Sequence, residues 1–162
     1  MKMPDFDSKR LNRIIKIYLV VQILLAMLLV FMAYNFQQLF ALRGKPDQFI
    51  FSLIAAIICQ LILLYPVYRL SRRDAGIEID GCVLGISVET LAVLRKKRLM
   101  TDLWKFSVVV FFITFVAMAP DASRASGAPL VLSTSIFSFL LICLTYFQGF
   151  SFCAKKQMKQ MI

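Results

Sequence analysis

The sequence contains no histidine, and its acidic residues are few, with nine Asp and Glu against nineteen Lys and Arg in 162 residues. Histidine is the usual axial ligand of haem and a common ligand of copper and zinc, so its absence predicts that the chain ligates no redox cofactor or metal. The patterns HExxH and GxSxG and a glycine-rich phosphate loop are missing as well. We therefore expect a protein that is not an enzyme and that has no catalytic, cofactor-binding or metal-binding residues.

Charged residues are also scarce, at 17% of the chain, whereas hydrophobic residues make up 60%. Soluble domains are about 25% charged and about half apolar, so the composition indicates a chain whose solvent is largely lipid. The four cysteines form no CxxC pair and show no regular spacing, which argues against structural disulfides; they are Cys59, Cys82, Cys143 and Cys153.

Four apolar stretches reach the length of about 20 residues that a helix needs to cross a membrane. They cover residues 17–40, 49–68, 101–119 and 130–153. Short clusters of turn-forming residues join the first stretch to the second and the third to the fourth. The sequence thus predicts an all-α integral membrane protein with four transmembrane helices, arranged as two hairpins in a single membrane domain over residues 1–162.

A polar, basic link at residues 69–100 joins the two hairpins. Within it, Asp80 and Gly81 stand between β-favouring residues, which predicts a small β-hairpin with a tight turn. A competing interpretation begins a helix after Ser87, with this serine as N-cap and Glu89 close to the positive end of the helix dipole. We expect a short β-like or irregular piece followed by a helix.

The basic residues are distributed unevenly around the four spans. Sixteen of the nineteen Lys and Arg fall in the N-terminal, middle and C-terminal segments, and only Arg43, Lys45 and Arg124 fall in the other two connections. Cytoplasmic segments of membrane proteins carry such an excess. The prediction is a multi-pass protein of a bacterial inner membrane, with both termini and the link in the cytoplasm.

Three glutamines are the most distinctive polar residues inside the spans: Gln22, Gln60 and Gln148. An amide in hydrocarbon seeks a partner, so we expect interhelical hydrogen bonds to one another or to backbone carbonyls, each worth about 1 kcal/mol. A quinone or substrate site is the alternative. No ionisable side chain falls in the deep apolar core of any span, which argues against a proton-driven carrier.

Small residues recur about once per turn on two of the spans, which is typical of faces where helix backbones approach closely. On the second span these residues are Ser52, Ala55 and Cys59, and on the fourth they are Thr145, Gly149 and Cys153. We expect these faces to be helix contacts.

Basic residues flanking the spans are candidate contacts for other molecules. Residues predicted to meet anionic lipid head groups or an acidic cytoplasmic partner are Arg72, Arg73, Arg95, Lys96, Lys97, Arg98 and Trp104. The third and fourth spans also carry more aromatic rings than a four-helix core can enclose, so some must face lipid or another subunit. Expected partners are membrane lipids and other membrane subunits, and not nucleic acid.

Two hairpins around a basic cytoplasmic link, residues 69–100, are similar in outline to several small membrane families, including the subunit I accessory proteins of bacterial ATP synthases. The similarity is one of topology. Together with the missing catalytic groups, the pattern favours a non-catalytic accessory, structural or assembly subunit of a larger membrane complex. The alternative is a homo-oligomeric channel or carrier for a neutral or lipid-like solute. A membrane enzyme ranks lowest, because no base accompanies any nucleophile.

Overall fold

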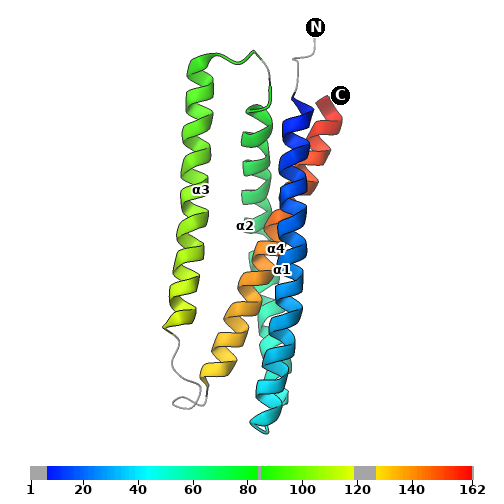
Figure 1. The fold of residues 1–162 in the computed structure, drawn as a ribbon, viewed down its shortest axis with the longest axis vertical. Coiled ribbons are helices and arrows are strands. Elements are labelled where there is room, and N and C mark those ends of the chain that lie inside the picture. The colour runs from blue at the N-terminus through cyan, green and yellow to red at the C-terminus, as the bar shows by residue number, and fades with distance from the viewer. Residues whose placement is uncertain (1–6, 84, 119–126, 162) are drawn as a thin grey trace.

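The computed structural model describes residues 7–83, 85–118 and 127–161 of the chain. It contains four helices, which are α1 (Ser8–Leu42), α2 (Asp47–Asp80), α3 (Val88–Ala117) and α4 (Ala128–Met161) (Figure 1). Each is long and apolar enough to cross a membrane, so the predicted four-span, all-α architecture is confirmed. Successive helices alternate in direction, and α2 therefore runs parallel to α4.

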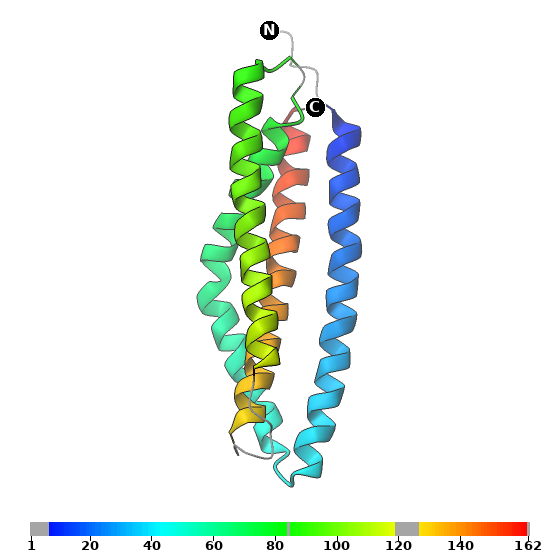
Figure 2. The ribbon, with the colours of Figure 1, turned by 60° about the vertical axis from the view of Figure 1, so that its left-hand side comes forward.

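Both the start of α1 and the end of α4 lie at one end of the bundle, together with the connection between α2 and α3 (Figures 1 and 2). We call this the basic end, because its helix segments carry most of the Lys and Arg residues. At the opposite end, α1 turns into α2 through Gly44, whose φ of 66° suits glycine. The N–H of Gly44 donates to the carbonyl of Ala41 at 3.0 Å.

The predicted β-hairpin around Asp80 and Gly81 is wrong, and no strand occurs among the residues described. Helix α2 continues through Asp80, and the N–H of Gly81 donates to the carbonyl of Ile77 at 3.1 Å. The local β preference loses because Ala75 and Ile79, one helical turn apart, are both fully buried against α1 and α4. Burial at helical spacing decides the structure here, as tertiary contacts routinely override short-range propensity.

The alternative interpretation, a helix that begins after Ser87, is confirmed. The Oγ of Ser87 accepts a hydrogen bond from the N–H of Thr90 at 3.3 Å, and Glu89 lies in the first turn of α3. Only residues 81–87 therefore connect α2 with α3. Most of the polar link expected at residues 69–100 consists of helix that extends beyond the apolar runs.

The bundle is centred on α4, which makes its largest interface with α2 and its second largest with α1. One apolar cluster lies at the basic end, where Leu11 of α1 and Phe150 of α4 are buried. A second cluster lies toward the other end, around Phe40 of α1 and Phe137 of α4. Helices adjacent in sequence thus contact each other less than α2 contacts α4.

Gly149 of α4 brings the backbones of α2 and α4 close together. A Cβ atom at this position would lie 2.5 Å from the Oγ and 3.3 Å from the Cβ of Ser71, which is fully buried on α2. The Ser71 hydroxyl is also held, since it donates to the carbonyl of Tyr68 at 2.8 Å. Small residues at both positions therefore determine how closely the two helices can pack.

We predict that Gly149→Ala lowers the free energy of unfolding by about 1–2 kcal/mol, because the new methyl group overpacks the contact with Ser71. The cost should shrink in a Ser71→Ala background, where the Oγ is gone. Unfolding of the purified protein in mild detergent, followed by titration with a denaturing detergent, measures both effects.

The matched control is Gly76→Ala on α2, where an added Cβ meets nothing within 4 Å. This change should be neutral or stabilising by up to about 1 kcal/mol, since alanine favours helix over glycine. Equal responses at Gly76 and Gly149 would contradict the close contact.

Candidate functional site

Asp74 of α2 is an acidic residue enclosed between three helices. It lies six residues beyond the apolar run that ends at Tyr68 and is only 6% exposed. The Tyr146 hydroxyl of α4 donates to Asp74 Oδ2 at 2.6 Å, and the Lys105 Nζ of α3 lies 3.3 Å from the same oxygen. A single carboxylate oxygen thus joins α2, α3 and α4.

Glu78, one turn further along α2, extends this arrangement to α1. Its side chain is 9% exposed, and its Oε1 lies 3.1 Å from Arg98 of α3 and 3.9 Å from Arg10 of α1. Asp102 of α3 lies 3.9 Å from Arg98 and 3.6 Å from Lys105. We call these residues the polar cluster: Arg10, Asp74, Glu78, Arg98, Asp102, Lys105 and Tyr146.

Charge pairing makes the burial of the two carboxylates tolerable, because an isolated buried charge costs several kcal/mol. Lys105 pairs with both Asp74 and Asp102, and its Nζ also lies 5.0 Å from the centre of the Tyr146 ring. The cavity inside the cluster has a volume of about 30 Å³ and is lined in part by Tyr18 and Thr101. A cavity of this volume can hold a water molecule but not a substrate. The geometry of the cluster is therefore that of a structural contact that links the helices.

Helix α3 is held to the bundle mainly at two places. One is the polar cluster, which α3 joins through Arg98, Asp102 and Lys105 in its middle part. The other is a stacked pair of rings, Phe112 on Phe139 of α4, with centroids 3.8 Å apart and an interplanar angle of 4°. Of the residues in α3, only Thr101 is buried. Large apolar side chains such as Trp104 and Phe111 are more than 70% exposed, so α3 presents an uncovered flank.

The seven residues predicted to contact lipid or a partner are all exposed. Two of them also make internal contacts, because Arg73 Nε lies 3.5 Å from Asp74 Oδ1 and Arg98 pairs with Glu78. The remaining five are at the surface of the basic end of α2 and α3: Arg72, Arg95, Lys96, Lys97 and Trp104.

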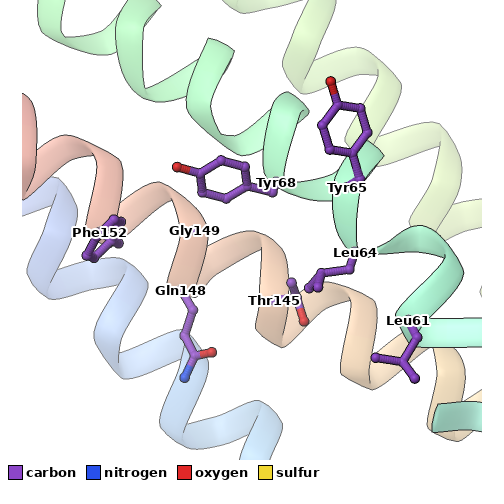
Figure 3. Close-up of a pocket in the computed structure, with 8 residues that line it drawn as sticks. All are labelled: Leu61, Leu64, Tyr65, Tyr68, Thr145, Gln148, Gly149 and Phe152. Carbon is purple, nitrogen blue, oxygen red and sulfur yellow. The ribbon is translucent and has the colours of Figure 1, made fainter. Parts of the chain in front are cut away.

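The three glutamines do not meet one another. Gln22 of α1 donates through Nε2 to the Ser151 Oγ of α4 at 3.3 Å, and Gln60 of α2 donates through Nε2 to Thr145 Oγ1 of α4. Gln148 is exposed and lines a groove between α2 and α4 (Figure 3). The partners of the first two are hydroxyl groups of α4, which again makes α4 the central helix.

Sequence reasoning missed the polar cluster because it assigned Asp74 and Glu78 to a solvated link. A signal was present, since Ser71, Ala75 and Ile79 recur every four residues and indicate that a packed helix continues. Asp74 and Glu78 have the same spacing of four, which puts both carboxylates on one helix face. Their partners on α3 and α4 lie too far away in sequence for any local pattern to reveal.

Cys82, just after α2, is the one cysteine in the link. It is 2% exposed, and burial raises the pKa of its thiol, so the neutral form dominates near pH 7. Its carbonyl accepts a hydrogen bond from the N–H of Asp7 at 2.9 Å. Cys82 therefore packs as a small apolar residue and is not an activated nucleophile.

Comparison of the chain with models of known protein families, with curated proteins and with solved structures found no match.

We predict that Asp74→Ala lowers the free energy of unfolding by about 2–3 kcal/mol, because it removes the acceptor of the Tyr146 hydroxyl and the buried one of the two carboxylates that pair with Lys105. The partial exposure of Lys105 and its second pair with Asp102 keep the value below that of a fully buried pair. Asp74→Asn, which can still accept from Tyr146, should cost less. The same detergent-unfolding measurement reports both changes.

Asp80→Ala provides the control on the same helix, because Asp80 is exposed. Its effect should stay within about 0.5 kcal/mol, and loss of a negative charge at the end of a helix favours slight stabilisation. If Asp74→Ala were as mild as Asp80→Ala, the polar cluster would not hold the helices together.

Proposed function

We propose that this chain is a non-catalytic accessory, structural or assembly subunit of a larger membrane protein complex, and that α3 is the helix that its partners contact. The observation that carries the proposal is the one-sided attachment of α3. Helices α1, α2 and α4 share two buried apolar clusters, whereas Thr101 is the only buried residue of α3.

The difference in burial between α3 and the other three helices matters because the bundle is expected to lie in a membrane. In lipid, no hydrophobic force drives helices together, so close packing and polar contacts determine which helices associate. Helix α3 has the polar cluster and one aromatic stack, and little close packing besides. Its exposed rings, including Phe106 and Phe111, supply apolar surface on which a transmembrane helix of another subunit can pack.

The start of α3 adds a polar surface to this flank. Arg95, Lys96 and Lys97 are exposed there, next to the exposed Trp104 of the following turns. Consecutive cations at a membrane border suit an acidic segment of a partner or anionic head groups. The proposed contact therefore continues from the apolar flank of α3 onto its basic beginning.

The proposal includes an orientation. The excess of Lys and Arg at the basic end supports a cytoplasmic location for both termini and for the connection between α2 and α3, in a bacterial inner membrane. The proposed partner surface at the start of α3 would then be reached from the cytoplasm.

Native mass spectrometry of the tagged protein, extracted gently from its own membranes, tests the role. We expect reproducible, stoichiometric foreign subunits. The double variant Phe106→Ala, Phe111→Ala should lose them, whereas the control Phe31→Ala, at an exposed position of α1, should retain them. A clean homo-oligomer without foreign chains would contradict the accessory role and favour the alternative of a channel or carrier for a neutral or lipid-like solute.

Orientation can be tested by cysteine labelling in a variant that lacks the four native cysteines. We expect Lys45→Cys, in the turn between α1 and α2, to react with a membrane-impermeant maleimide in right-side-out vesicles. Lys155→Cys, at the basic end, should react only after the vesicles are permeabilised. The reverse pattern would contradict the proposed orientation without affecting the test for partner subunits.

A further inference from the structure

A groove of about 660 Å³ lies between α2 and α4, and neither α1 nor α3 contributes to its lining (Figure 3). Leu61, Leu64 and Tyr65 border it on α2, and Thr145 and Phe152 border it on α4. Leu61, Tyr65 and Phe152 are all more than 60% exposed, so the groove opens sideways at the surface of the bundle. Its volume is typical of small-molecule sites, which run from about 300 to 1,000 Å³.

Two contacts between α2 and α4 adjoin the groove. Gln60 bonds to Thr145, and Ser71 meets Gly149, so both α4 residues of these contacts also line the groove. Between them stands Pro66, which has no N–H to bond to the carbonyl of Ile62, and α2 changes direction in its middle part (Figure 2). The groove therefore lies where α2 diverges from α4 before it approaches α4 again.

The chemistry of the groove changes in one direction. Leucines line the part farther from the basic end, and the tyrosines Tyr65 and Tyr68 and the amide of Gln148 follow. Arg72 continues the face of Tyr65 and Tyr68, because these residues are spaced at i, i+3 and i+7.

On α4, Gln148, Phe152 and Lys156 are spaced at i, i+4 and i+8, so Lys156 continues the opposite wall in the same way. Arg72 and Lys156 are both exposed, and neither forms an ion pair with any residue that the structure describes. Two unpaired cations thus follow the polar end of an apolar groove.

We propose that this groove binds a phospholipid with an anionic head group, with an acyl chain against the leucines and the phosphate at Arg72 and Lys156. Along the groove, apolar side chains are followed by hydroxyl groups and an amide, and then by two cations. This order matches an amphipathic anion and not a neutral lipid. A partner helix fits less well, because Leu61 to Tyr68 covers only about 10 Å of helix. No residue of α3 lines the site, so the proposal stands independently of the proposed function and of the orientation.

The test uses the full-length protein, delipidated in detergent and titrated with phosphatidylglycerol or with phosphatidylcholine of identical chains, with bound lipid read by native mass spectrometry. We expect one saturable site that prefers phosphatidylglycerol by roughly 30-fold, which is the preference that two cations near a head group supply. The double variant Arg72→Gln, Lys156→Gln should bind both lipids equally and weakly.

The control Arg95→Gln, Lys97→Gln removes two exposed cations of α3 outside the groove and should retain the preference. Leu64→Trp, which fills the groove, should weaken binding of both lipids while the unfolding transition stays in place. If both charge variants lost the preference for phosphatidylglycerol equally, binding would follow net charge and the proposal would be overturned. A preference for phosphatidylcholine in the unaltered protein would overturn it as well, because binding would then follow the solubility of the acyl chains.

Discussion

The contact between Ser71 and Gly149 sets how closely α2 and α4 can approach, and these two helices share the largest interface of the bundle. One turn from it, at three residues' distance on each helix, Tyr146 donates to Asp74. The groove that contains Tyr65 borders the same contact, since Gly149 is one of its lining residues. A larger side chain at position 149 would therefore shift the polar cluster and the groove at the same time.

The polar cluster can exist because it stands where the apolar runs end. Asp74 lies about 9 Å of helix beyond Tyr68, and Lys105 directly precedes the apolar run of α3. At this level a carboxylate can be enclosed by protein while its lysine partner, whose side chain is 33% exposed, still reaches polar surroundings. The same pair placed at the middle of a span would pay a much higher desolvation cost.

The sequence alone predicted the four spans, because long apolar runs between turn-forming residues have few alternative structures. It also predicted the start of α3, since the capping by Ser87 is a local interaction. It failed at Asp80 and Gly81, where a local turn signal competed with burial of Ala75 and Ile79 against distant helices. The polar cluster was missed for the same reason, because the partners of Asp74 are 31 and 72 residues away along the chain.

The two ways in which helices are attached in this bundle have different consequences. Helices α1, α2 and α4 are joined by buried side chains at both ends, and a shift of one against another would open cavities in two apolar clusters. Helix α3 is joined by ion pairs such as Arg98 with Glu78, whose distances can change without opening a cavity, and by one ring stack. The proposed contact with another subunit is therefore more easily provided by α3 than by the three packed helices, whereas the fixed packing of α2 against α4 suits the proposed lipid groove.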